Sequence, residues 1–126
     1  MRIVIYGMGR EQVLELVRSV APAGSTVDSL SDYQAANEIR TGQADAAIGV
    51  CQSGAGGALA IPMALLGSAS CAQLSTPSRQ PTDDEIVAAA GSGKKVFGLA
   101  LGHVDAAVPT LVRALTTPAA PAGSSA

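Results

Sequence analysis

The sequence predicts a single α/β domain with a five-stranded, mainly parallel sheet and helices on both faces. Short apolar runs alternate with helical patterns along the whole chain, and the connections between them are short. A chain of 126 residues is also long enough to bury one hydrophobic core. For five strands, the flavodoxin-like order 2-1-3-4-5 is the default arrangement.

The first half of the chain carries three of the expected strands, at about residues 2–6, 26–30 and 45–50. The third is almost continuously apolar, as a strand buried on both faces should be. A helix over about 10–20 places apolar residues at helical spacing, namely Val13, Leu16, Val17 and Val20. A second helix follows Ser31, whose capping box is completed by Gln34, and ends at Thr41-Gly42.

The second half is expected to hold strands at about 70–74 and 95–101 and three further helices. These helices are predicted over about 58–66, 83–90 and 105–115. The middle one has a capping box from Thr82 to Glu85 and is expected to bury Ile86, Val87 and Ala90. Because proline breaks helix interiors, Pro62 and Pro109 are expected near the first turns of the other two. The domain should therefore span 1–116, with 117–126 as a disordered tail of Pro, Ala, Gly and Ser.

Composition narrows the class of protein. Charged residues make up 14% of the chain, against about 25% in typical soluble domains. Part of the surface is therefore expected to be buried in a homo-oligomer, although a compositionally biased genome would explain the same deficit. With a net charge of −2, dispersed basic residues and 2% aromatics, nucleic acid is not expected as a partner.

The chain also lacks the marks of membrane and metal proteins. No apolar run approaches the roughly 20 residues of a membrane span, so membrane insertion is not expected. The strand-like start at Arg2 does not resemble a signal peptide, which predicts a cytoplasmic location. Neither a metal site nor a cofactor is expected. The two cysteines, Cys51 and Cys71, should lie at opposite edges of the sheet, too far apart for a disulfide.

The strongest candidate site is the glycine-rich loop after the third strand. Its glycines allow successive N–H groups to point at one anion, and the following helix adds its positive end. Cys51 and Ser53 are the candidate catalytic residues, and the expected ligand-binding residues are Gln52, Gly54, Ala55, Gly56 and Gly57. The alternative is a tight turn beside a buried, inert cysteine.

Two further groups should reach the same carboxyl edge of the sheet. Gly7, Gly9 and Arg10 follow the first strand, where Arg10 could pair with a phosphate or carboxylate. His103, the only histidine, follows the fifth strand and could contact a ligand or act as an acid or base. The alternatives are that Gly7 and Gly9 only form a tightly packed turn, and that Arg10 and His103 are side chains exposed to solvent.

Taken as a whole, the sequence is similar to the YhfU-like bacterial proteins, a family catalogued as a domain of unknown function. The similarity is carried by Arg2-Ile3-Val4-Ile5, by Gly42-Gln43-Ala44-Asp45 and above all by the segment from Cys51 to Ala60. It implies a small cytoplasmic protein and names no activity.

The middle third also resembles ribose-5-phosphate isomerase B and its galactose-6-phosphate relatives. The shared features are Asp32-Tyr33, Gly42-Gln43-Ala44-Asp45 and the Cys-x-Ser-Gly-x-Gly loop over residues 51–56. This resemblance implies that Cys51 is the base, Ser53 its hydroxyl partner and the loop an oxyanion site. Three features of those isomerases are replaced here: an Asp-His pair by residues 6–10, an Asn-Lys pair by Pro62-Met63, and a glycine by Gln52.

These patterns leave three functional hypotheses open. The first is a protein that binds a small anionic metabolite, bearing phosphate or carboxylate, at the glycine-rich loop. The second is an aldose–ketose isomerase-like enzyme that uses Cys51 as its base. The third is a self-assembling structural protein, whose low charge reflects extensive subunit contacts.

Overall fold

The computed structural model describes residues 1–52 and 56–117. Ser53, Gly54, Ala55 and most of the expected tail (118–126) therefore lie outside the described residues. The strands are β1 (Arg2–Gly7), β2 (Thr26–Ser29), β3 (Ala46–Cys51), β4 (Cys71–Gln73) and β5 (Val96–Ala100). The helices are α1 (Arg10–Val20), α2 (Asp32–Thr41), α3 (Gly56–Leu66), α4 (Asp83–Gly91) and α5 (Val104–Thr116), with short 3-10 turns η1 (Ser68–Ser70) and η2 (Leu101–His103).

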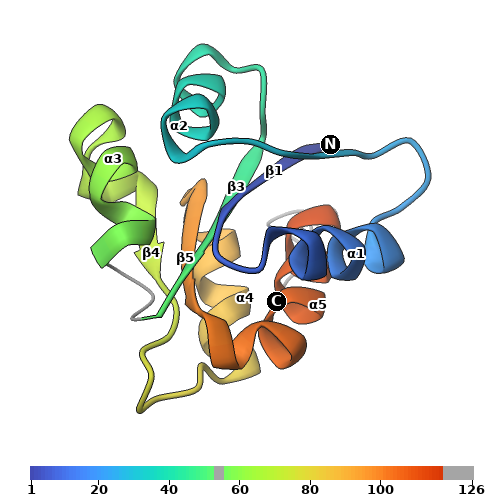
Figure 1. The fold of residues 1–126 in the computed structure, drawn as a ribbon. Coiled ribbons are helices and arrows are strands. Elements are labelled where there is room, and N and C mark those ends of the chain that lie inside the picture. Colours follow the sequence, from blue (N-terminus) through green and yellow to red (C-terminus); the bar gives the residue numbers. More distant parts are fainter. Residues whose placement is uncertain (53–55, 118–126) are drawn as a thin grey trace, which may run out of the picture.

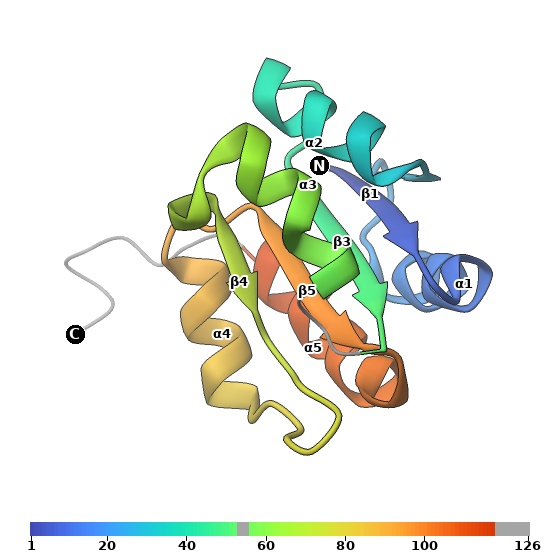
Figure 2. The same ribbon diagram turned by 60° about the vertical axis from the view of Figure 1, so that its left-hand side comes forward.

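The five strands form one sheet, parallel throughout, between two layers of helices (Figures 1 and 2). Helices α1, α4 and α5 cover one face, where the larger core cluster includes Ile5, Ile48 and Phe97. Helices α2 and α3 cover the other face over a smaller cluster around Tyr6 and Leu59. The α/β class predicted from the alternating pattern is confirmed.

The order of the strands corrects the prediction in its last two positions. The sheet runs β2-β1-β3-β5-β4 instead of 2-1-3-4-5, so β5 lies beside β3 and β4 forms the edge. All five residues of β5 are buried, whereas β4 has three residues and ends in the exposed Gln73. A fully apolar strand gains most from the interior of a sheet, where both of its faces are covered.

The changed order also decides which face α4 covers. Parallel strands are connected by right-handed crossovers, so the direction of travel along the sheet sets the face on which a helix lies. The chain moves one way through α2 and α3, then turns back from β4 to β5 and places α4 with α1 and α5. In the order 2-1-3-4-5, α4 would have joined α2 and α3.

The capping boxes of two helices are confirmed. The side chain of Ser31 accepts a hydrogen bond from the Gln34 amide at the start of α2, and Thr82 does the same for Glu85 at the start of α4. Both are interactions over three residues, which explains why local sequence predicts them. The predicted burial of Val87 is wrong, because its side chain is 53% exposed on the outer side of α4.

The prolines lie deeper in their helices than predicted. Helix α3 begins at Gly56 instead of about residue 58, and α5 begins at Val104, so Pro62 and Pro109 are interior residues. A proline has no N–H to donate to the carbonyl four residues earlier. For Pro62 this carbonyl belongs to Ala58, and the buried hydroxyl of Tyr6 donates a hydrogen bond to it. Tertiary structure thus replaces the bond that the proline removes.

Tyr6 also fixes the contact between β1 and β3. Its side chain is 1% exposed and lies against Gly49, its neighbour in register on β3. A Cβ atom placed on Gly49 would lie 2.3 Å from Cζ of Tyr6, so only glycine fits there. Burial raises the pKa of the Tyr6 phenol above its usual range, which keeps the hydroxyl protonated as a donor to Ala58.

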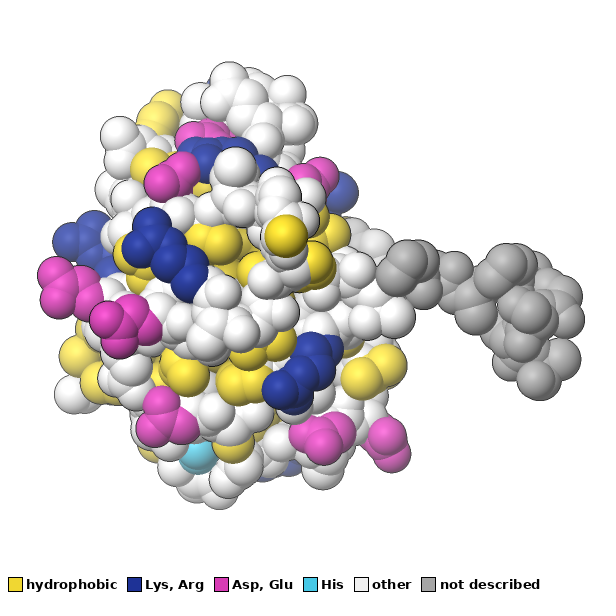
Figure 3. Space-filling view, turned by 90° about the vertical axis from the view of Figure 1, so that its right-hand side faces the viewer, with side chains coloured by type: hydrophobic (Ala, Val, Ile, Leu, Met, Phe, Trp, Pro, Cys, Tyr) yellow, Lys and Arg dark blue, Asp and Glu magenta, His cyan; other side chains and the backbone are white. Residues whose placement is uncertain are grey.

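Charged side chains of both signs are dispersed over the side of the molecule that carries α1 (Figure 3). Arg2 forms ion pairs with Asp28 and with Glu38, where Nε lies 2.7 Å from Oε1 of the glutamate. Its backbone N–H donates to Asp45 Oδ2 at 2.7 Å. These bonds join β1 to β2, α2 and the start of β3 at the amino edge of the sheet, away from the predicted site.

Replacing Gly49 with alanine is expected to destabilise the fold by about 1–3 kcal/mol, the usual result of overpacking a core. The reason is the buried Tyr6 ring, which cannot move aside without losing its hydrogen bond. Urea denaturation followed by circular dichroism measures the change. The control is Gly91→Ala at the end of α4, where an added Cβ meets nothing within 4 Å. It should be neutral or stabilise by up to about 1 kcal/mol, and equal losses in both variants would contradict the packing argument.

A double-mutant cycle tests the bond that compensates for the proline. Tyr6→Phe should cost about 1–3 kcal/mol, because it leaves the buried Ala58 carbonyl without a donor. In a Pro62→Ala background the same change should cost less than half as much, since the backbone at position 62 then supplies an N–H. The free energies of unfolding from denaturant titration give the coupling. Identical costs in the two backgrounds would refute this role for the hydroxyl.

Candidate functional site

The carboxyl ends of the three central strands meet at one edge of the sheet. Gly7 pairs in register with Val50, and Cys51 with Ala100. This pairing brings together the turn Gly7–Arg10, the end of β3 at Cys51-Gln52 and the segment Leu101–His103. Loops from β1 and β5 lead to one face and the loop from β3 to the other, so the connections diverge on both sides of β3.

The turn after β1 lies directly against β3. The amide of Met8 donates to the Val50 carbonyl at 2.8 Å. Gly7 has a φ of 96°, and a Cβ atom there would lie 2.2 Å from the same carbonyl oxygen. Gly9 has a φ of 64° and forms the N-cap of α1. Glycine is therefore required at Gly7 by close approach, while the turn itself stays exposed to solvent.

Hydrogen bonds tie the remaining loops to this edge. Gln12 Nε2 donates to Asp105 Oδ1 at 2.7 Å, which joins the first turns of α1 and α5. The buried Ser75 accepts a hydrogen bond from the Ala100 amide at 2.7 Å and so anchors the loop after β4. Sequence reasoning missed both contacts, because the partners are 93 and 25 residues apart and form no local motif.

The glycine-rich segment after β3 differs in part from its prediction as a loop. Gly56 and Gly57, expected in the loop, instead form the first turn of α3. A helix can begin with glycines when later residues, such as the buried Leu59, hold it against the sheet. Ser53, Gly54 and Ala55 lie outside the described residues. Gln52 is exposed at the end of β3.

The two cysteines have different surroundings. Cys51 is half-buried at the carboxyl end of β3, whereas Cys71 is buried where β4 begins. Burial raises the pKa of the Cys71 thiol, with a smaller opposing effect from Lys94. Cys51 is level with Ala100 and Cys71 with Val96, about 13 Å along the strands. The prediction that they form no disulfide is confirmed.

His103 is the N-cap residue of α5 and ends η2 beside the other loops. Its Nδ1 atom is buried and has no hydrogen-bond partner among the described residues. Arg10 is exposed at the start of α1. The structure thus places Gly7, Gly9, Arg10, Gln52 and His103 on one edge, together with Cys51.

The helix starts along this edge fall into two groups. At the outer strands, α2 and α4 have complete capping boxes. At the central strands, α1 and α5 begin at Gly9 and His103 with no side-chain hydrogen bond to the cap. First-turn amides without a side-chain cap are satisfied by water, by a ligand or by a 3-10 bond, as the Val104 amide of α5 is by the Leu101 carbonyl. Together these helix starts present the positive ends of the helix dipoles. The cap of α3 falls on residues that the structure does not describe.

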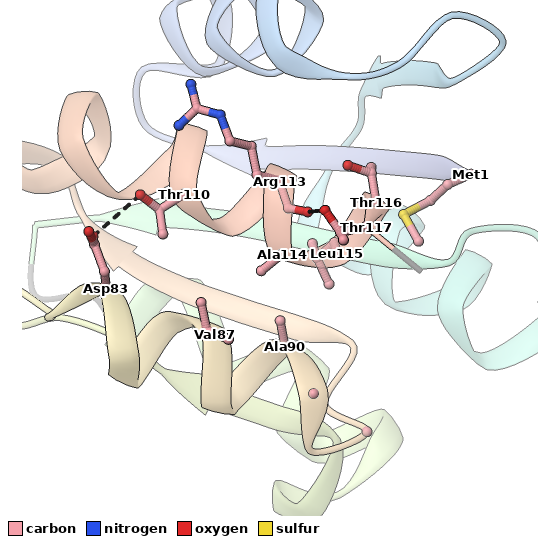
Figure 4. A pocket seen from close by; sticks show the side chains of 12 residues that line it. Met1, Asp83, Val87, Ala90, Thr110, Arg113, Ala114, Leu115, Thr116 and Thr117 are labelled. Carbon is pink, nitrogen blue, oxygen red and sulfur yellow. Dashed lines mark hydrogen bonds between the residues drawn. The ribbon is translucent and has the colours of Figure 1, made fainter. Parts of the chain in front are cut away.

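A groove of about 1090 Å³ lies elsewhere, between α4 and α5 (Figure 4). Val87 and Ala90 line it from α4, with Thr110, Arg113 and Ala114 across from them on α5. Thr110 donates to Asp83 at 3.4 Å, and the Arg113 guanidinium points away from Val87 and Ala90. The groove is mostly apolar, and it lies away from the carboxyl ends of the strands, where the loops of an open α/β sheet converge. The carboxyl edge is therefore the stronger candidate site.

Two further searches cover the described part of the chain. No group of three or more His, Cys, Asp or Glu side chains in it is arranged to hold a metal ion. None of its helices combines the length and the apolar character needed to cross a membrane.

Comparison with known proteins confirms both resemblances seen in the sequence. The relatives named "Uncharacterized protein YhfU" from Escherichia coli K12 and from Shigella flexneri are each 34% identical over 114 residues, covering 90% of this chain and 97% of the relative. The crystal structure of ribose-5-phosphate isomerase B from Giardia lamblia matches with a TM-score of 0.68 at 18% identity, over 91% of this chain and 93% of that one. At this identity the match shows a shared fold. Residues 1–115 match the family described as "Protein of unknown function DUF2620", and the chain belongs to that family.

Proposed function

We propose that the protein binds a small anionic metabolite, bearing a phosphate or carboxylate group, at the carboxyl edge of β1, β3 and β5. The observation that carries this proposal is the contrast between helix starts. The helices after the outer strands each satisfy a first-turn amide with a capping box, whereas α1 and α5 have no side-chain cap, although the Val104 amide of α5 donates to the Leu101 carbonyl. Amides at a helix start are suited to an anion because their N–H groups and the helix dipole act together.

The shape of the edge supports the same proposal. The exposed turn at Gly7 and Gly9 leaves backbone open to a ligand, and no side chain projects from it at these two positions. Connections that diverge on both sides of β3 create the crevice in which ligands of open α/β sheets usually bind.

The side chains around the edge suit a phosphate or carboxylate. Arg10 can supply a charge-assisted pair of hydrogen bonds, and Gln52 can supply amide donors. His103 is half-buried beside these groups and adds a further polar side chain to the edge. A strongly basic cluster is absent from these described residues, which favours a small ligand over a polyanion.

An aldose–ketose isomerase-like activity is the second candidate, and the position of Cys51 favours it. The cysteine ends β3 at the same edge and is half-buried, so a bound sugar phosphate could approach its sulfur. The fold is shared with a ribose-5-phosphate isomerase B. In this reaction a base at Cys51 would move a proton between adjacent carbons of the sugar.

Binding is tested by following backbone amides in NMR spectra during titration with inorganic phosphate, at constant ionic strength set by chloride. Shifts are expected at Met8–Glu11 and at Gly102–Asp105. Arg10→Gln should weaken binding by roughly tenfold, the loss of one charge-assisted contact. Arg40→Gln at the far end of α2 removes the same charge and should leave binding unchanged. Shifts confined to other regions, or none at millimolar phosphate, would refute the site.

Catalysis is tested separately with ribose 5-phosphate in D₂O, where an isomerase incorporates solvent deuterium at the carbon next to the carbonyl. Cys51→Ala should lower the rate by about 100-fold or more while phosphate binding persists. Cys71→Ala is the matched control, since Cys71 is buried at the other end of the strands, and should keep the wild-type rate. If the wild-type protein exchanges no deuterium yet binds phosphate, the binding function stands and isomerisation of ribose 5-phosphate is excluded.

A further inference from the structure

One flank of the molecule carries no charge. The chain has 8 basic and 10 acidic residues, yet residues 46–78 contain no Asp, Glu, Lys, Arg or His. This segment includes β3 in the centre of the sheet, but α3, η1 and β4 reach the surface. We call the described surface of α3, η1 and β4 the uncharged flank; Figure 2 shows α3 and the edge strand β4 on this side.

Helix α3 presents apolar side chains to solvent as well as to the core. Ala58 and Leu59 are buried against the sheet, while Met63 and Leu65 are 39% and 38% exposed. Ala60 and Ala64 are exposed as well, and no residue from 58 to 66 has a polar side chain. A helix that is apolar on every side is normally covered on every side. The outer face of α3 therefore indicates a surface that becomes buried.

The two edge strands of the sheet, β2 and β4, differ in the charged side chains around them. At β2, Asp28 pairs with Arg2, and the Arg18 guanidinium donates to the Val27 carbonyl at 3.4 Å. Charges at an edge strand discourage pairing with another chain. At β4, the residues Cys71, Ala72 and Gln73 carry no charge, and among the described strands β4 pairs with β5 alone. The β2 edge therefore carries charged side chains that disfavour pairing with another chain, and the β4 strand carries none.

We infer that the uncharged flank is the interface of a homodimer, in which a second copy of this chain packs α3 against α3 and extends the sheet at β4. In a twofold dimer the same surface meets itself. A surface without charge does so without like-charge repulsion, whereas a charged partner would find no complementary charge on it. Two β4 strands related by this axis run antiparallel and supply each other's missing backbone partners.

The required area explains why both elements take part. A stable interface buries about 800 Å² on each partner. The 11 residues of α3 form a helix only about 16 Å long, too small a footprint by itself. The adjoining η1 and the edge of β4 enlarge this surface without a break. Lys94, whose charge acts on Cys71, and Arg79 on the loop after β4 then lie at the polar rim.

The groove between α4 and α5 is the competing surface. Val87 is 53% exposed there, but Asp83 and Arg113 also line it. A contact through this groove would remove both charged groups from water, and each would then need a partner across the interface. Packing through the uncharged flank buries no charged side chain. The inference also does not depend on the proposed ligand or on its site.

Light scattering after size exclusion tests the interface on the full chain at about 10–100 µM, because interfaces of standard size have dissociation constants in the micromolar range or below. The wild-type protein should have twice the chain mass of 12.5 kDa. Leu65→Glu should return the single-chain mass, because it would bury an unpaired charge and raise the dissociation constant by roughly 100-fold or more. Met63→Lys is a second variant at an exposed position, and circular dichroism checks that both remain folded. Val87→Glu is an apolar-to-charged change on α4, at a position more exposed than Leu65, and should stay dimeric.

Hydrogen exchange of the wild-type protein gives a readout that needs no variant. Leu74 donates to Gly98 on β5, so by strand alternation the amide of Gln73 points away from β5, toward the open edge. This amide should become more protected as protein concentration rises through the dimer range, while that of Val27 on the β2 edge should not change. A wild-type monomer at about 100 µM would overturn the proposal, since an interface of standard size should be populated well below that concentration. A folded dimer of both α3 variants, dissociation by Val87→Glu or concentration-independent exchange at β4 would overturn it as well.

Discussion

The contact between Tyr6 and Gly49 is the constraint on which the arrangement of this protein depends. The Tyr6 ring occupies the space that the Cβ atom of any other residue at position 49 would need. Strands β1 and β3 can therefore pair in this register only with glycine at position 49. Its hydroxyl then reaches Ala58 and satisfies the carbonyl that Pro62 leaves without a donor. One side chain thus joins two central strands to the first turn of α3. Helix α3 begins at Gly56, near the carboxyl end of β3, where the candidate site lies.

Helix α3 has weak local support for its own formation. It begins with two glycines, contains a proline and has no charged residue to favour either end of its dipole. Its stability therefore comes from tertiary packing, on the sheet side through Ala58 and Leu59. In the proposed dimer, the outer face of the same helix is covered by its copy. Helix α3 would then contribute to both features, because its outer face lies in the proposed interface and its first residues lie at the carboxyl edge of the sheet.

The distribution of capping separates the structural and the functional ends of the helices. Ser31 and Thr82 close the helices at the sheet margins with interactions that stabilise the fold. Gly9 and His103 begin the helices at the central strands without that stabilisation. Departures from local rules that cluster on one edge of a fold are typical of functional sites. The shared fold with a ribose-5-phosphate isomerase B adds a second reason to test sugar phosphates at this edge.

The sequence by itself determined the α/β class, most helix and strand positions and both capping boxes. These features depend on periodicity and on contacts over three or four residues, such as Ser31 with Gln34, which local sequence contains. It also located the turn after β1 and the end of β3 on a common edge, since parallel strands all end on the same side. Only the tertiary structure decided that β5 lies inside β4, because the order follows from competition between whole strands for buried positions. The same holds for Pro62 and Ser75, whose partners Tyr6 and Ala100 lie far away in the chain and become neighbours only when the sheet forms.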